Sequence, residues 1–180
     1  IELVADHTTF SGFSAYEVGG GSADVNNCTF TDFNGAGCKV KGVSTITSFT
    51  DNTFIAGSFM GGSAMAIRSE SGGDTDPDNI TITGTFGFAD ISLENCVWEF
   101  NNSSFNPNNN NLNSSSGILS KNHNKAGIDA TYTGLYDCLM ILPDGELDLN
   151  KFTNTLSNQH VTIHKHTGMT DQELVLNASG

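Results

Sequence analysis

The sequence predicts an all-β fold in which short strands wind into a solenoid, and three observations lead to this prediction. Asn, Thr, Ser and Gly together supply 77 of the 180 residues, and all four are poor helix formers. Apolar residues occur in short runs with a period of two, and no longer segment has the 3.6-residue period of a helix. A small motif also recurs along the chain, which is typical of repeat proteins.

The expected strands follow in chain order, and Gly, Asn or another turn-forming residue bounds each of them. In segment 45–49 (TITSF), β-branched and aromatic residues alternate with polar ones, as expected for a strand with one buried face. The predicted strands are 40–43, 45–49, 80–83, 91–93, 139–142, 147–149, 161–163 and 174–176.

The recurring motif consists of Asn or Asp, then Cys or Thr, then one residue and a large apolar residue. The separations are 68 residues from Cys28 to Cys96 and 42 from Cys96 to Cys138, which fit three and two coils of about 21–23 residues. Coils of that size, with an inward hydrophobic residue and polar residues stacked at the corners, describe a parallel β-helix. The motif reads Asn27-Cys28-Thr29-Phe30, Asn95-Cys96-Val97-Trp98 and Asp137-Cys138-Leu139-Met140, with shorter forms at Asn52-Thr53-Phe54 and Asn154-Thr155-Leu156.

The strings NNCTFTDFNGAG, SFTDNTFIAG and ISLENCVWEFNN resemble right-handed parallel β-helix repeat proteins, namely the pectin-lyase-like superfamily and its bacterial surface relatives. The resemblance covers residues 20–165. It implies Asn side chains stacked inside the corners, and the matching positions are Asn27, Asn52, Asn95 and Asn154. The alternative fold is a β-sandwich or jelly roll, which also has many short strands joined by Gly-rich turns.

The length suits a single domain over residues 1–180. Within it, the low-complexity stretch 101–116 (NNSSFNPNNNNLNSSS) is expected to be a mobile or glycan-bearing loop that contributes nothing to the core.

The cysteines are predicted to be buried thiols. Equivalent sites two or three coils apart lie beyond the Cα separation of about 7 Å that a disulfide tolerates, so Cys28, Cys96 and Cys138 cannot pair with one another. Cys28 and Cys38 are near enough in sequence to bridge within one coil, and that alternative stays open.

The charge balance limits the possible partners. The 7 Lys and Arg residues against 20 Asp and Glu give a net charge of −13, which lacks the basic footprint of a nucleic-acid-binding protein. No apolar run approaches the roughly 18–20 residues of a membrane-spanning helix, so membrane insertion is not expected. The acidic, hydroxyl- and amide-rich composition favours an extracellular or cell-surface location. Six Asn-x-Ser/Thr sequons suggest glycosylation at Asn27, Asn79, Asn101, Asn102, Asn113 and Asn177.

One acidic segment is a candidate calcium site. Asp74, Asp76 and Asp78 alternate in GGDTDPDN, and three carboxylates at this spacing in a turn can converge on a hard cation. The alternative is a solvated acidic loop tip that binds no metal.

The preferred function is that of a non-catalytic extracellular structural protein, either a self-associating fibre subunit or a segment of a surface stalk or adhesin. Each end of a solenoid exposes unpaired backbone groups unless a cap covers it. The segments IELV and ELVL are strand-like and apolar, and could pair with the next copy through Ile1, Leu3, Leu174 and Leu176.

Two other classes of function remain open. A carbohydrate- or receptor-binding module, as in a tailspike, would use Tyr16, Tyr132 and Tyr136 as stacking platforms. A polysaccharide lyase or glycosidase would use the acidic segment with calcium, or Glu146 with Asp148. The second class is the weaker, because Arg68 is the sole Arg and no basic cluster accompanies it to neutralise an acidic sugar.

Overall fold

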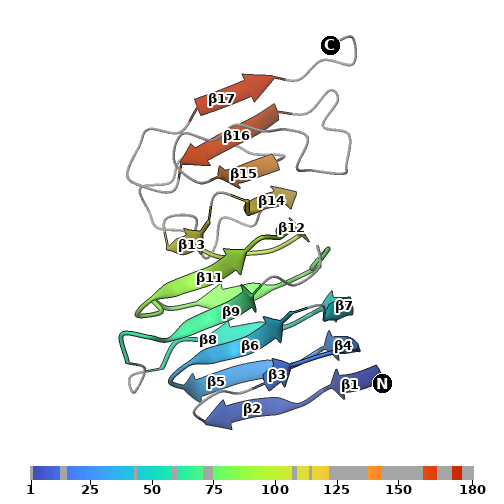
Figure 1. Ribbon diagram of the computed structural model, residues 1–180. Helices are drawn as coiled ribbons and strands as arrows, with labels where there is room; N and C mark the ends of the chain where they lie inside the picture. The colour runs from blue at the N-terminus through green and yellow to red at the C-terminus, as the bar shows by residue number, and fades with distance from the viewer. Residues whose placement is uncertain are drawn as a thin grey trace.

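The protein is a parallel β-solenoid of about four turns in the computed structural model (Figure 1). The structure describes residues 2–12, 16–42, 44–57, 61–70, 75–106, 109–113, 115–121, 138–142, 160–165 and 172–175. These residues contain strands and turns, and no helix of a length and hydropathy that would cross a membrane. The predicted all-β solenoid is therefore confirmed, and the sandwich alternative is wrong because neighbouring strands of the coils run parallel.

The first three turns of the solenoid each contribute one strand to each of three sheets, which we call A, B and C in the order in which the chain visits them, and later strands extend sheets B and C. Sheet A contains β1 (Glu2–Asp6), β4 (Ser22–Asn26) and β7 (Thr45–Thr50). Sheet B contains β2 (Thr9–Gly12), β5 (Thr29–Phe33), β8 (Thr53–Ile55) and β10 (Thr81–Thr83). Sheet C contains β3 (Tyr16–Val18), β6 (Ala36–Lys41), β9 (Met65–Glu70), β11 (Ala89–Glu94) and β13 (Asn110–Leu112).

The C-terminal strands continue the stack with a different pairing. β12 (Val97–Asn101) pairs in parallel with β14 (Gly117–Lys121). β15 (Cys138–Leu142) then lies antiparallel to β14, β16 (His160–Lys165) parallel to β15, and β17 (Gln172–Val175) antiparallel to β16. The regular parallel winding therefore holds as far as β14 within the described residues.

The coils differ in length more than the sequence predicts. In sheet B, Thr9 pairs with Thr29, Thr29 with Thr53, Thr53 with Thr81, and Thr81 with Ser104. One turn therefore takes 20, 24, 28 and then 23 residues, so the expected uniform repeat of 21–23 residues is wrong. Turns of unequal length lie outside the strands, where extra residues leave the pairing register intact.

The predicted equivalence of Cys28 and Cys96 is also wrong. Cys28 follows β4 at the corner between sheets A and B, whereas Cys96 follows β11 at the corner between sheets C and A. Both corners turn on an Asn in the left-handed region, Asn27 with φ 54° and Asn95 with φ 57°. Asn tolerates this conformation better than most residues, so the same local motif appears wherever the chain needs a tight turn.

The core lies between the three sheets and is aromatic along sheet B. The ring of Phe30 stacks on those of Phe10 and Phe54, with centroid separations of 5.0 and 4.5 Å. The inner face of sheet C is aliphatic and contains Ile67 and Ile91, both fully buried.

Cys28, Cys38 and Cys96 are buried free thiols in this core, which confirms the prediction for Cys28 and Cys96. Because Cys28 and Cys38 are unpaired, the alternative disulfide is wrong. Burial raises the pKa of the Cys38 thiol to about 12, so this thiol stays protonated and packs as an apolar side chain. The side chain of Cys138 lies outside the described residues.

The low-complexity stretch 101–116 is part of the solenoid where the structure describes it, so the predicted loop is wrong there. It begins with the last residue of β12, contains β13, and pairs Ser104 with Thr81 of the preceding coil. Phe105 is fully buried and Leu112 nearly so. Two well-spaced apolar residues are enough to anchor a coil when the coil below it supplies the remaining contacts.

Candidate binding surfaces

The corner between sheets A and B carries a ladder of five residues in the left-handed conformation, with φ between 48° and 54°. We call it the corner ladder. In each successive coil, the member follows directly after the segment at the sheet A position. The members are His7, Asn27, Asp51, Asn79 and Asn102. Such a turn redirects the chain within one residue, which explains why short polar residues occupy nearly every rung.

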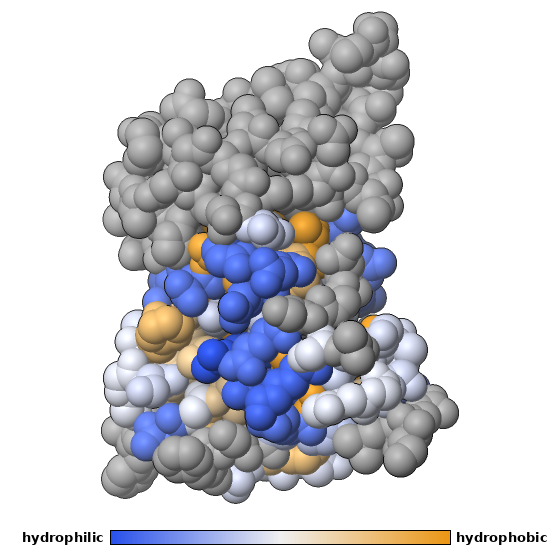
Figure 2. Space-filling model, viewed as in Figure 1, coloured by the Kyte–Doolittle hydropathy of each residue, from blue (hydrophilic) through white to orange (hydrophobic). Residues whose placement is uncertain are grey.

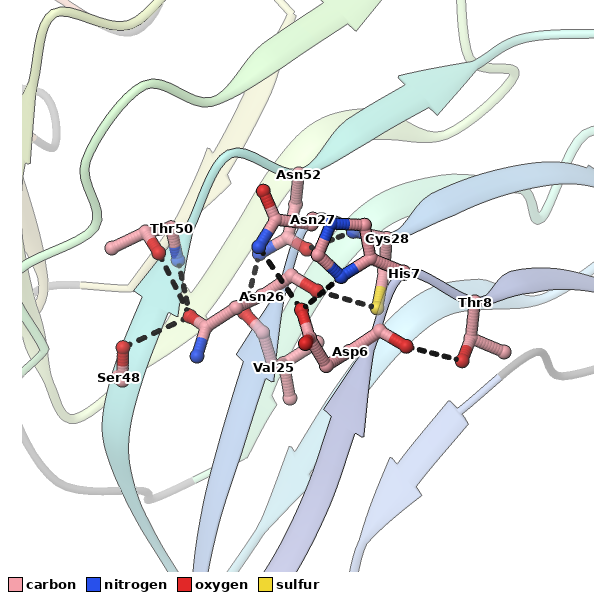
Figure 3. A network of polar contacts seen from close by, with 10 residues as sticks. All are labelled: Asp6, His7, Thr8, Val25, Asn26, Asn27, Cys28, Ser48, Thr50 and Asn52. Atoms are coloured by element: carbon pink, nitrogen blue, oxygen red, sulfur yellow. Dashed lines mark hydrogen bonds and ion pairs between the residues drawn. The ribbon is translucent and has the colours of Figure 1, made fainter.

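Hydrogen bonds connect the rungs, and Figure 3 shows the first of them. The side-chain amide of Asn27 donates to Asp6 Oδ1 over 3.0 Å, and that of Asn79 donates to Asp51 Oδ1 over 2.5 Å. Asn102 repeats the contact with Asp78 Oδ1 at 3.1 Å. Each bond joins an amide of one coil to a carboxylate of the coil before it, so the corner ladder ties successive turns together.

A second set of hydrogen bonds is buried behind the corner ladder. Asn52 is fully buried; its Oδ1 accepts from the Cys28 backbone N–H at 3.0 Å and its Nδ2 donates to the Val25 carbonyl at 2.7 Å (Figure 3). Two coils further, Ser103 Oγ accepts from the Ile80 N–H at 3.0 Å. Asn52 therefore has the inside-corner role that the resemblance implies for it, and it satisfies two backbone groups that the turn leaves unpaired.

The corner ladder explains three of the predicted glycosylation sequons. Asn27, Asn79 and Asn102 are exposed rungs, each followed by a buried residue and then by the Thr or Ser that begins the sheet B position. The rungs at His7 and Asp51 have the same geometry without an Asn. The other three sequons do not belong to the corner ladder. Asn101 is the last residue of β12, and Asn177 lies outside the described residues. The Asn113 amide donates to Asn95 Oδ1 at 3.2 Å. The fold alone thus accounts for the sequons at the ladder, and glycosylation stays a prediction.

The predicted calcium ligands are only partly described. Asp78 bridges Thr50 and Asn101 in the continuation of sheet A, and its carboxylate accepts from Asn102. Asp76 is exposed two residues earlier, and Asp74 lies outside the described residues. Among the side chains that the structure places, no three His, Cys, Asp or Glu residues gather closely enough to hold a metal ion. The calcium site therefore stays a prediction.

Sheet C carries an open groove of about 450 Å³ on its outer face. Arg68 of β9, Ser92 of β11 and Asn111 of β13 are register partners across three coils and form its floor. Phe88, 49% exposed, and Glu94 also line it. Figure 2 shows hydrophilic residues gathered on the face that carries β6, β9 and β11. A groove of this size with guanidinium, carboxylate, hydroxyl, amide and aromatic groups has the chemistry of a small-ligand site.

Ion pairs fix the cationic side chains of sheet C. Glu70 accepts from both Lys39 at 3.2 Å and Arg68 at 2.5 Å, and Lys41 pairs with Glu17 at 2.9 Å. The Lys41 ammonium lowers the pKa of the Glu17 carboxyl through their hydrogen bond. Arg68 is thus paired on the floor of the groove, with part of its side chain still open to solvent.

Asp90 is the one strongly perturbed carboxyl in the described part of the chain, and sequence reasoning missed it. It is 1% exposed; its Oδ1 accepts from the Asn109 amide at 2.7 Å and its Oδ2 from the Asn106 N–H at 3.1 Å. Burial raises its pKa to about 6 despite these bonds. Because both oxygens accept bonds from the next coil, Asp90 clamps that coil and is not available to a substrate. The only signal in the sequence is an acidic residue within the apolar run FADISL.

Of the predicted aromatic platforms, the structure describes Tyr16. The ring of Tyr16 packs on Phe10 with a centroid separation of 5.0 Å, and its hydroxyl is buried, so the expectation of an exposed stacking surface is wrong for this residue. Tyr132, Tyr136, Glu146 and Asp148 lie outside the described residues. Phe88 is the exposed aromatic of the groove, and nothing in its sequence context separates it from core residues.

The predicted self-association residues fall at the two ends of the strand order. Leu3 lies in β1, the first strand of sheet A, and Leu174 lies in β17, the last strand of the C-terminal stack. Ile1 and Leu176 lie outside the described residues. Comparisons of the chain with protein-family models, with curated proteins and with solved structures found no match.

Proposed function

We propose that the protein is a non-catalytic structural module of an extracellular or cell-surface assembly, and that it extends end to end through its first coil. One observation carries the proposal. β1, β2 and β3 each stand at the end of their sheet in the described chain and pair with a neighbour on one side only. Strands with one unpaired edge are a template for a further solenoid coil, which in this proposal comes from a second copy.

The aromatic stack supports the same reading. Phe10 is partly buried and stacks on Phe30 at 5.0 Å with an interplanar angle of 12°. The Phe10 ring also packs on Tyr16 at 5.0 Å and is not fully buried, and an apolar side chain of a second copy would cover its remaining exposed part. The fold is also the one expected from the resemblance to right-handed parallel β-helix surface proteins, and membership of that superfamily is part of this proposal.

The test is sedimentation velocity over a range of concentrations, with electron microscopy of the same samples. We expect end-to-end oligomers or fibres from the native chain and their loss in Phe10→Lys, since a charge at the open end of the stack would be desolvated in the junction. Phe88→Lys, a matched change on the outer face of sheet C, is the control and should leave assembly unchanged. A chelator arm examines the Asp74, Asp76 and Asp78 hypothesis, because fibre loss on chelation would implicate that segment.

A monomer at every concentration would contradict end-to-end assembly. Equal loss in the two lysine variants would contradict it as well, because the effect would then not belong to the first coil. Circular dichroism of both variants checks that the solenoid is intact.

The groove of sheet C favours carbohydrate binding as a second candidate function. An exposed aromatic ring beside a row of hydroxyl, amide and guanidinium groups matches the stacked face and hydroxyl rim of a sugar. Isothermal titration with acidic and neutral oligosaccharides tests this. Phe88→Ala should abolish binding, and Lys41→Gln, on the same sheet but outside the groove, should preserve it. If binding persists in Phe88→Ala, the groove is not the site.

A further inference from the structure

The outer face of sheet B presents two columns of mostly hydroxyl side chains, and the first of them is in register across four strands. The strands read Thr-Phe-Ser, Thr-Phe-Thr, Thr-Phe-Ile and Thr-Ile-Thr, with the central residue buried in the core each time except at the half-buried Phe10. The first column is Thr9, Thr29, Thr53 and Thr81, ending at the buried Ser104. The second column is Thr31, Ile55 and Thr83, which pair in register; Ser11 precedes it in β2, where the register shifts between Phe10 and Gly12.

The hydroxyls of the first column are free to bond outward. Within the described residues, Thr9, Thr29, Thr53 and Thr81 make no side-chain hydrogen bond to the protein. In the second column, the Thr31 hydroxyl donates to Asp32 at 3.3 Å and the Thr83 hydroxyl to the Phe54 carbonyl at 3.4 Å. Water therefore satisfies the first column, and it does so at sites that repeat with the strands.

The spacing of these sites is set by the sheet itself. Neighbouring strands lie about 4.8 Å apart, and residues two apart on one strand are about 6.7 Å apart, so the two columns form a nearly rectangular array. The oxygen atoms of the prism face of hexagonal ice repeat at similar distances in two perpendicular directions. Branching at Cβ restricts χ1 of Thr, so the hydroxyls and methyls lose less conformational entropy on binding than flexible side chains would.

The absence of charge on this face also fits contact with an ice lattice. Neither column contains a charged residue, although the protein carries a net charge of −13. Asp32, the nearest carboxylate on these strands, follows the second column at the end of β5. An ice lattice is uncharged. A neutral array of hydroxyls and methyls can form hydrogen bonds with it, whereas charged side chains would orient nearby water away from the lattice arrangement.

Strand propensity does not by itself explain the array. Thr is favoured in strands of any sheet, yet the outward column of sheet C at the corresponding rungs reads Glu17, Lys39 and Arg68. Among sheets A, B and C, unpaired hydroxyls, lattice spacing and neutrality coincide on sheet B alone.

We propose that the outer face of sheet B binds ice, with the Thr columns holding a layer of ordered water that matches the lattice. The proposal is independent of end-to-end assembly and of the groove on sheet C. The test measures ice-crystal shaping and the inhibition of ice recrystallisation by the native chain and three variants.

In Thr53→Tyr, a bulky ring at the centre of the first column would keep the face from lying flat, and we expect loss of most of the inhibition. Thr45→Tyr makes the same change at an exposed position of sheet A and should retain native activity. Ile55→Thr completes the second column and should raise the activity. Tyr and Thr are both favoured in strands, so all three variants should fold, which circular dichroism and the unfolding midpoint check.

A native chain that neither shapes crystals nor slows recrystallisation overturns the proposal. Equal loss in Thr53→Tyr and Thr45→Tyr overturns it too. A second copy of the chain is the alternative partner for this face, and sedimentation at the assay concentration tests for it. If Thr53→Tyr breaks a dimer of the native chain, the face is occupied by a second copy and does not bind ice.

Discussion

Sheets B and C share one backbone repeat and have opposite surfaces. Sheet B has an aromatic inner face, and the two columns on its outer face contain no charged residue. Sheet C has an aliphatic inner face and an outer face of ion pairs around a groove. Both pair strand on strand through the first four coils.

The difference shows that the backbone supplies register and that the columns of side chains decide what each face can contact. In a solenoid a residue type repeated at one rung becomes a continuous column, so a small bias in the sequence is amplified into a surface. The same amplification acts inside the protein, where Phe10, Phe30 and Phe54 form one stack. The four predictions that follow separate the contributions of the two sheets.

The largest effect is expected inside sheet B. Phe54 is fully buried, and its ring stacks on Phe30 and contacts the ring of Phe49. Phe54→Ala should lower the free energy of unfolding by about 3–5 kcal/mol, because it removes buried contacts and leaves a cavity. Cys38→Ala, on the inner face of sheet C, removes a single sulfur and should cost only about 1 kcal/mol. Urea titration of both variants measures the contrast, and equal losses would mean that the aromatic stack adds nothing beyond ordinary burial.

The second largest effect on stability depends on pH and arises from Asp90, at the start of β11 in sheet C. The pKa of Asp90 is raised from 3.8 to about 6, so the folded protein holds this proton more tightly than the unfolded chain. Its contribution to the free energy of unfolding should therefore fall as pH rises from about 4 to about 6, by about 3 kcal/mol, and stay constant above that range.

The readout is the difference in unfolding free energy between the native chain and Asp90→Asn, measured at pH 4 and at pH 7. Other carboxyls titrate in both proteins and cancel in the difference. A difference that is the same at the two pH values would show that the Asp90 carboxyl is not perturbed.

A moderate effect is expected where the two sheets meet. A Cβ on Gly37 of β6 would lie 2.8 Å from Phe33 Cζ, 2.9 Å from the Ala66 carbonyl oxygen and 3.0 Å from Phe54 Cδ1. Gly37→Ala should therefore destabilise the protein by about 1–3 kcal/mol through overpacking. Gly62→Ala, where nothing lies within 4 Å of the added atom, is the control and should change stability by less than about 0.5 kcal/mol. A neutral Gly37→Ala would mean that the sheet B rings shift freely.

The smallest effect is expected on the outer face of sheet C. Glu70→Gln leaves Lys39 and Arg68 as neighbouring cations without their shared carboxylate. Because these groups are partly exposed, the loss should be about 0.5–1 kcal/mol and should shrink in high salt. Unfolding in low and high salt checks this, and a salt-independent loss would assign the effect to packing instead.

Several features of the fold were predictable because they depend on neighbouring residues alone. Alternation of Thr with Phe in 29–31 places the ring inside and the hydroxyls outside, whatever the rest of the chain does. The preference of Asn for left-handed turns likewise marks Asn27 and Asn95 as corners. The motif could not say which corner, since Asn serves equally well at both, and this is why Cys28 and Cys96 were wrongly aligned.

The surfaces were not predictable in the same way, because they depend on which strands become neighbours. Thr-Phe-Ser, Thr-Phe-Thr, Thr-Phe-Ile and Thr-Ile-Thr are separated by 20, 24 and 28 residues, and this irregular spacing hid their common column from a search for a fixed repeat. Arg68, Ser92 and Asn111 form the groove floor only once three coils are stacked. The clamp at Asp90 likewise depends on the position of Asn106 and Asn109 in the next coil.

The sequence by itself thus determined the strands, the inward and outward faces and the presence of tight polar corners, since each follows from local periodicity and backbone preference. The tertiary structure decided the lengths of the coils, the composition of each column, the groove and the burial of Asp90. Those features require turns of unequal length to bring distant strands into register, and only the packing of one coil on the next sets that register.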